Sequence, residues 1–97
     1  MDIEIEILIC YDVENNKKRK KLYDQLKQFG LIPIQKSVFW GFILPAEKNA
    51  ILREVGKIID KEDKAFLVYT NLSKVIKEQS FGYKDLEIFK NKDYIII

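Results

Sequence analysis

The sequence contains no histidine and only one cysteine, and these two scarcities exclude whole classes of site. Without histidine there is no Ser-His or Cys-His nucleophile pair and no imidazole general base. Cys10 alone cannot form an internal disulfide or a cysteine-based zinc cluster, and its presence is compatible with a reducing compartment. A metal-bound hydroxide needs no histidine, so metal-dependent hydrolysis stays open.

Long apolar runs are also missing. No stretch approaches the roughly 20 residues that a membrane-spanning helix needs, and the first residues alternate isoleucine with acid, unlike a signal peptide. We therefore expect a cytoplasmic protein with no membrane contact. Seventeen basic and fifteen acidic residues give a formal net charge of +2, so any electrostatic argument has to be local. With 97 residues, 47% of them apolar, the chain is expected to form a single domain, residues 1–97, around one modest core.

Apolar spacing predicts the order of the elements. Residues 3–12 alternate, with isoleucines on one side and Leu8 and Cys10 on the other. Helical spacing follows over residues 16–29, with Asn15 as the expected N-cap and Gly30 as the end. The other expected elements are strands 32–36 and 38–44 with a turn near Ser37, a helix from Pro45 to about Asp60, a strand over 65–70, one helical turn over 72–77, and strand-like segments at 86–90 and 94–97.

This order predicts an α+β fold, a ferredoxin-like βαββαβ sandwich with an extra C-terminal strand. Both helices should cover the isoleucine side of the sheet, which leaves Leu8 and Cys10 on a bare apolar face. Such a face usually marks an interface, so we expect a face-to-face homodimer. Residues 71–97 would form a tail that contacts the second copy or another partner, with the terminal "YIII" pairing across the interface. The alternative is a monomer whose last strand folds back over its own sheet.

One acid, Asp12, stands at the end of the first strand. It shares its side with Leu8 and Cys10, where an isolated buried carboxylate would be costly. In a two-fold dimer each copy supplies one Asp12, and the pair could hold a Mg²⁺ ion that meets a phosphate oxygen. Asp12 is therefore the candidate metal ligand and catalytic residue. The alternative is that Asp12 only terminates the strand.

A run of five basic residues opens the first helix. Cations at the N-terminal end of a helix oppose its macrodipole, so helix stability does not explain their presence. Neutralisation of phosphate groups is the natural candidate for their role. The alternative is a solvated helix face, although Glu14 and Asp24 are too few to neutralise the run. The candidate nucleic-acid-binding residues are Lys17, Lys18, Arg19, Lys20 and Lys21.

The stretch "VFWGFIL", residues 38–44, offers a rival interpretation. Its centre, from Trp40 to Ile43, matches the aromatic motif by which RNA-recognition domains stack bases on this same topology. The positions around that centre do not match, because Val38 and Phe39 stand where the motif has a basic residue and a glycine. We therefore expect these aromatic side chains to belong to the core.

Four stretches stand out together: "YDV" at the end of the first strand, "NKKRKKLYDQLKQFGL" as the first helix, "IQKSVFWG", and "PAE" at the start of the second helix. In this order and spacing they resemble the CRISPR-associated Cas2 family, the small partner of the CRISPR integrase in spacer acquisition. The similarity covers most of residues 5–70. Beyond Thr70 the match fades, and Trp40 stands where many members have an acidic or polar residue.

The resemblance implies a ferredoxin-like homodimer with its acids at the interface. Family members are described as metal-dependent endonucleases on RNA or DNA, and the aspartate of their tyrosine-aspartate pair, here Asp12, binds Mg²⁺. They also bridge two integrase dimers and a stretch of double-stranded DNA without catalysis. Arg19 matches the family's basic position in the first helix, and Ser37 and Phe39 match its serine-valine-phenylalanine strand.

Taken together, we expect a nucleic-acid-binding homodimer of CRISPR adaptation with Mg²⁺ or Mn²⁺ as its metal. Its expected partners are the integrase, double-stranded DNA and single-stranded RNA. Two roles stay open: paired Asp12 side chains cleave phosphodiesters with the metal, or the dimer only binds phosphates and docks the integrase. A toxin-like endoribonuclease on the same fold is a further alternative, and it would need no integrase.

Overall fold

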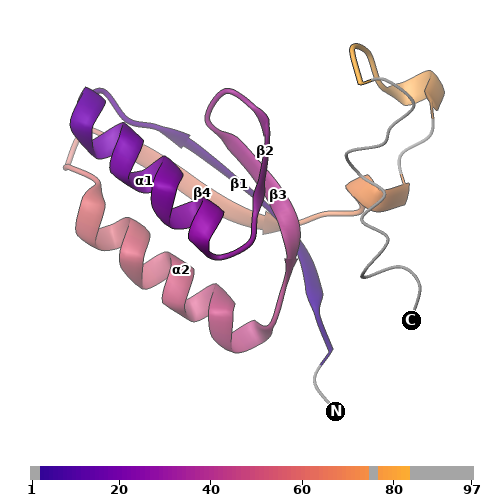
Figure 1. The fold of residues 1–97 in the computed structure, drawn as a ribbon, viewed down its shortest axis with the longest axis horizontal. Coiled ribbons are helices and arrows are strands. Elements are labelled where there is room, and N and C mark those ends of the chain that lie inside the picture. The colour runs from indigo at the N-terminus through magenta and orange to yellow at the C-terminus, as the bar shows by residue number, and fades with distance from the viewer. Residues whose placement is uncertain (1–2, 75–76, 84–97) are drawn as a thin grey trace.

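Residues 3–74 and 77–83 are described by the computed structural model. One antiparallel sheet has the order β2-β3-β1-β4, formed by β1 (Ile5–Asp12), β2 (Ile32–Gln35), β3 (Val38–Ile43) and β4 (Lys64–Tyr69). Two helices, α1 (Asn16–Gln28) and α2 (Pro45–Ile58), lie together on one side of it (Figure 1). This is the predicted ferredoxin-like βαββαβ arrangement. The strand-like segments expected at 86–90 and 94–97 lie outside the described residues.

Local signals in the sequence set the ends of the elements. The Asn15 side chain accepts a hydrogen bond of 2.9 Å from the backbone N–H of Lys18, which caps α1 as predicted. After α1 the chain turns at Gly30, whose φ of +89° suits glycine. At the start of α2 the Glu47 carboxylate accepts a hydrogen bond of 2.8 Å from the backbone N–H of Leu44. No helix of the described residues is long and apolar enough to cross a membrane.

The core fills the space between the sheet and the two helices. Ile7, Ile9 and Tyr11 of β1 are buried there, which confirms that the helices cover the isoleucine side. At Gly41 the backbone of β3 runs close to the segment after α1, because a Cβ at this position would lie 2.8 Å from Cδ2 of Leu31. The helix-facing core residues from outside β1 are Val13, Leu22, Leu26, Leu31, Phe39, Ile43, Ile51, Val55 and Ile58.

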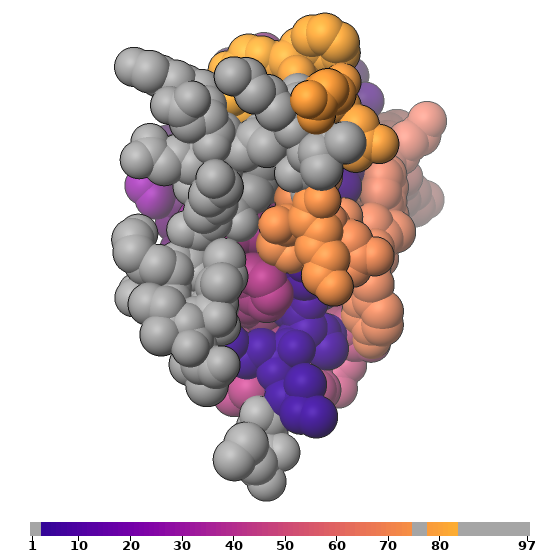
Figure 2. Space-filling model, turned by 90° about the vertical axis from the view of Figure 1, so that its right-hand side faces the viewer, coloured from indigo at the N-terminus to yellow at the C-terminus, as the bar shows by residue number. Residues whose placement is uncertain are grey.

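The opposite face of the sheet is partly covered by the chain itself, which corrects the expectation of a bare face. Beyond β4 the chain forms two short 3₁₀ turns, Leu72–Lys74 and Lys77–Gln79, where one helical turn over 72–77 was expected. We call the described residues 71–74 and 77–83 the strap. It lies on the side of the sheet away from the helices (Figure 1), and Figure 2 views the molecule from that side.

Trp40 anchors the contact between the strap and the sheet. It is fully buried, and Leu72 and Tyr83 of the strap pack against it together with Leu8 of β1. A side chain with no exposed surface cannot stack on a base, so the RNA-recognition interpretation is wrong for this residue. The expectation that the aromatic strand belongs to the core is confirmed.

Glu6 fixes the strap by hydrogen bonds that no local pattern in the sequence indicates. Its carboxylate accepts from the indole N–H of Trp40 at 2.8 Å, from the backbone N–H of Ser73 at 2.8 Å, and from the Ser73 hydroxyl at 2.6 Å. The other end of the strap is tied to β2, because the Tyr83 hydroxyl donates to the carbonyl oxygen of Ile34 at 3.1 Å. The strap is therefore held at both ends.

Candidate functional site

Part of the open sheet face stays exposed beside the strap. Pairing across β1 and β4 sets Cys10 opposite Phe66 and Leu8 opposite Val68, so these four side chains share the face. Phe66 is 56% exposed and Val68 is 41% exposed. Because β4 is also the edge strand of the described sheet, this corner combines apolar side chains with a strand edge that no described residue pairs. Surfaces of this kind favour contact with another polypeptide.

Asp12 lies at the border of this apolar corner. It pairs in register with Lys64 of β4, and its side chain is exposed. Within the described residues it forms no hydrogen bond and no ion pair. A cavity of about 280 Å³ beside it is lined by Tyr11, Ala65 and Phe66 as well as by Asp12 itself. The carboxylate is therefore open to a partner from outside the described residues, and its role as a metal ligand stays a prediction.

The described residues of a single copy do not form a cluster of metal ligands. Among residues 3–74 and 77–83, no three acidic, cysteine or histidine side chains come together. Mg²⁺ prefers oxygen ligands and is commonly held by one or two carboxylates, with waters in its other positions. Asp12 could be one of two carboxylates of such a site, and no described residue of the same copy supplies the second.

The two residues before Asp12 are uncharged at neutral pH. Burial raises the pKa of the Cys10 thiol. Burial also raises the pKa of Tyr11, with a further contribution from Tyr23, against a smaller lowering by Arg19 and by a hydrogen bond with Ser37. Neither side chain is therefore an anionic nucleophile or metal ligand near neutrality.

The fold divides the basic run at the start of α1. Lys18 forms an ion pair with Asp60, which follows α2, and Lys20 pairs with Asp24 at 2.9 Å. Lys17 and Lys21 are exposed and meet no acidic side chain in the described part of the chain. Asp60 was missed as a partner because it lies 42 residues from Lys18 in the sequence. The run thus offers two unpaired lysines rather than four.

Arg19 holds the loop that joins Asp12 to α1. One of its terminal nitrogens donates to the carbonyl oxygens of Val13, at 2.8 Å, and of Glu14, at 3.4 Å. The other donates to the side-chain oxygen of Asn16. All these acceptors are neutral, so the positive charge of Arg19 is not cancelled by a contact of its own. The predicted phosphate ligand is therefore also a structural residue of this loop.

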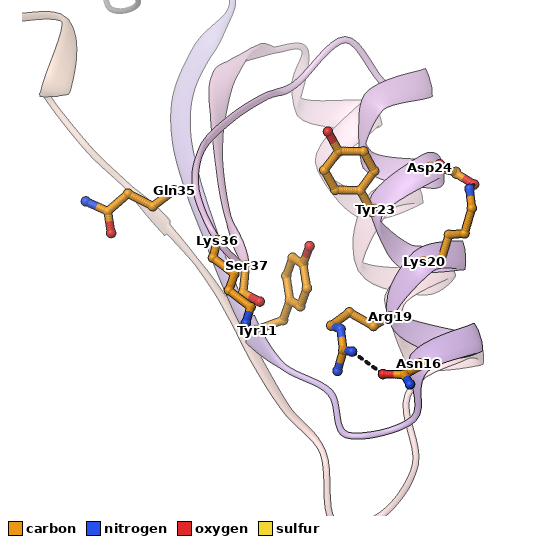
Figure 3. Close-up of a pocket in the computed structure, with 9 residues that line it drawn as sticks. All are labelled: Tyr11, Asn16, Arg19, Lys20, Tyr23, Asp24, Gln35, Lys36 and Ser37. Atoms are coloured by element: carbon orange, nitrogen blue, oxygen red, sulfur yellow. Dashed lines mark hydrogen bonds and ion pairs between the residues drawn. The ribbon is translucent and has the colours of Figure 1, made fainter. Parts of the chain in front are cut away.

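A second cavity, of about 500 Å³, opens between α1 and the β2–β3 turn (Figure 3). Tyr11, Arg19 and Ser37 line it together with Tyr23 and Lys36. The last two were not among the predicted site residues. They come from separate elements, and no spacing in the sequence indicates that they meet.

Known proteins resemble this chain over nearly its whole length. The sequence profile of the family described as CRISPR associated protein Cas2 matches residues 6–79. A protein of Francisella tularensis subsp. novicida (strain U112), named CRISPR-associated endoribonuclease Cas2 1, is 43% identical over 93 residues, which cover 96% of this chain and 95% of the relative. These matches confirm the resemblance that the four sequence stretches indicate.

Solved structures share the fold. Streptococcus pyogenes Cas2 at pH 6.5 superposes with a TM-score of 0.60 at 21% identity, covering 84% of this chain and 93% of that one. A chain from a partial Cas6-RT-Cas1–Cas2 complex superposes with a TM-score of 0.63 at 25% identity, covering 84% of this chain and 86% of that one.

Proposed function

The chain belongs to the Cas2 family of CRISPR-associated proteins, and we propose that it acts as a nucleic-acid-binding homodimer in spacer acquisition, with metal-dependent endonuclease activity at paired Asp12 side chains. The observation that carries this proposal is the placement of Asp12. It is an exposed carboxylate without a partner among the described residues, and it borders an apolar corner of the sheet.

A second copy of the chain is the proposed cover for the apolar corner. Phe66 and Val68 are large exposed apolar side chains in a chain of only 97 residues, and water around them is unfavourable. A two-fold axis near this corner would bury both residues from both copies. The same axis would bring the two Asp12 carboxylates toward each other, since Asp12 lies two residues along β1 from Cys10, on the same face of the sheet.

The paired carboxylates would hold Mg²⁺ or Mn²⁺. Such an ion, when bound, supplies a water of lowered pKa and a positive charge beside a phosphodiester. The chain's own contribution is to leave the Asp12 side chain exposed and to keep Cys10 and Tyr11 neutral. Lys64, opposite Asp12 in the register, adds a positive charge at the place where a phosphate would approach.

Lys17 and Lys21 are the proposed contacts to the phosphate backbone, because they are exposed and unpaired by acids of the described chain. Arg19 adds a fixed positive charge behind them. If each lysine of a dimer meets one phosphate, replacing both lysines by alanine removes about four contacts. The slope of log K against log salt for duplex DNA should then become shallower by roughly 3 to 4.

The relatives support the proposed substrate and partner classes. The Francisella tularensis relative carries the name endoribonuclease, which supports RNA as a substrate. One structural neighbour was solved in a complex with Cas1, which supports the integrase as a partner. We therefore include single-stranded RNA, double-stranded DNA and the integrase among the partners to be tested.

Substitution of Asp12 tests the catalytic part of the proposal. Asp12→Asn should abolish Mg²⁺- or Mn²⁺-dependent cleavage of RNA and DNA while leaving duplex binding by the lysines in place. Glu62→Gln is the matched control, because Glu62 is an exposed acid in the loop before β4 and its loss changes the net charge equally. Cleavage that survives in Asp12→Asn would contradict the assignment. Integration assays with the integrase then show whether binding without cleavage is sufficient for spacer acquisition.

A further inference from the structure

The cavity between α1 and the β2–β3 turn has the size of a small-ligand site, and aromatic side chains line it. Its volume of about 500 Å³ lies within the range of pockets that bury small ligands. Figure 3 shows the rings of Tyr11, from β1, and Tyr23, from α1, standing in the gap. Phe39 supports both rings, with centroid distances of 6.3 Å to Tyr11 and 5.2 Å to Tyr23. Tyr23 is nevertheless 38% exposed, so part of an aromatic surface stays open to a ligand.

Cations outnumber acids around this cavity. Arg19, Lys20 and Lys36 line it, whereas Asp24 is the one acid among its lining residues. Asp24 pairs with Lys20 at 2.9 Å, which leaves Arg19 and Lys36 without an acidic partner in the described chain. Arg19 is held in place by three neutral oxygens, so its orientation is fixed before any ligand arrives. The positive charges of Arg19 and Lys36 therefore lie on different walls of the cavity, since Arg19 belongs to α1 and Lys36 to the β2–β3 turn.

We propose that this cavity binds one nucleotide unit, with the base against Tyr23 and the phosphate between Arg19 and Lys36. Aromatic side chains stack bases of any sequence, and a guanidinium fixed beside an ammonium suits a phosphate. Tyr11 and Ser37 also line the cavity, and their hydroxyls provide further polar groups there.

The choice of a nucleotide as the ligand rests on the proposed function. The site itself is independent of it, because neither Asp12 nor the exposed lysines of α1 take part in binding the nucleotide. The unit is either a free nucleoside 5′-monophosphate or the terminal nucleotide of a strand.

Binding of AMP to the full chain, followed by amide chemical shifts in ¹⁵N-labelled protein, tests the cavity. AMP should shift amides of residues 16–24 and 35–37 and should bind about tenfold more tightly than adenosine or inorganic phosphate alone. Lys36→Glu should weaken AMP binding about tenfold. Lys61→Glu is the matched control, because Lys61 is exposed, lies in the loop after α2 and makes the same change of charge.

Tyr23→Leu separates the base from the phosphate. Leucine keeps an apolar contact with Phe39 but removes the aromatic ring, so AMP should then bind no better than inorganic phosphate. Equal weakening by Lys36→Glu and Lys61→Glu, or AMP affinity unchanged in Tyr23→Leu, would overturn the proposal.

Short adenosine oligonucleotides with and without a 5′-phosphate distinguish the two sources of the ligand. If the cavity takes a strand end, the phosphorylated strand shifts the same amides as AMP at equal or lower concentration, and the unphosphorylated strand does not. If it takes a free nucleotide, AMP alone produces those shifts. Absence of shifts at 16–24 and 35–37 with every probe overturns the cavity site. Duplex DNA binding in the same sample then shows whether the proposed function survives that result.

Discussion

Replacing Phe66 by serine should separate the proposed homodimer without unfolding the chain. Phe66 is 56% exposed, so about half of the burial of its side chain would be gained only against a second copy. That share is about 1.5 kcal/mol. A two-fold interface contains Phe66 from both copies, so the substitution should lower the free energy of dimerisation by about 3 kcal/mol. The dissociation constant of the dimer should therefore rise roughly a hundredfold.

Sedimentation equilibrium over a range of concentrations measures this change, and urea denaturation checks that the fold of the variant is intact. Leu52→Ser provides the matched control, because Leu52 is 45% exposed on α2, on the helix side of the sheet. Its removal should leave the dimer unaffected. A dimer that is indifferent to Phe66→Ser, or equally weakened by Leu52→Ser, would refute the placement of the interface on the open face.

Three further substitutions test the fold around the site. Gly41→Ala should lower the free energy of unfolding by about 2 kcal/mol, since its Cβ would lie 2.8 Å from Cδ2 of Leu31; unchanged urea stability would contradict this close approach. Glu6→Gln should cost about 1.5 kcal/mol and shift the fluorescence of Trp40 to the red, and an unshifted spectrum would show that the strap does not depend on the carboxylate. Tyr11→Phe should flatten the loss of stability at alkaline pH. Because burial raises the pKa of Tyr11 above its ordinary 10.0, the folded state holds this proton more tightly, and the resulting stability is fully present below pH 10 and is lost as the pH rises through the raised pKa. A loss of the same steepness in the variant would contradict that assignment.

Local chemistry in the sequence was sufficient for the order of the elements and for most of their ends. The alternation of isoleucines identifies the buried side of β1, and Asn15 and Gly30 mark the ends of α1, because these signals act within a few residues. The place of Asp12 on the open face followed from the same alternation. The sequence predicted that the helices leave one face of the sheet uncovered, but it did not predict that the strap covers the part of this face around Trp40.

Contacts between distant residues were beyond the sequence. Nothing in the spacing shows that Glu6 meets Ser73, 67 residues later, or that Lys18 meets Asp60. Both depend on how the finished layers pack. The role of Arg19 was missed for a related reason, because its acceptors are backbone carbonyls, which every residue has. The sequence therefore indicated which side chains carry charge but not which of them form ion pairs in the folded chain.

The stoichiometry of Mn²⁺ binding, followed by the electron paramagnetic resonance signal of the free ion, tests the pairing of the acids most directly. Two Asp12 carboxylates at one axis predict one tightly bound ion for every two chains, lost in Asp12→Asn and retained in Glu62→Gln. One ion for each chain, or binding that Asp12→Asn leaves unchanged, would contradict a metal site shared between two copies.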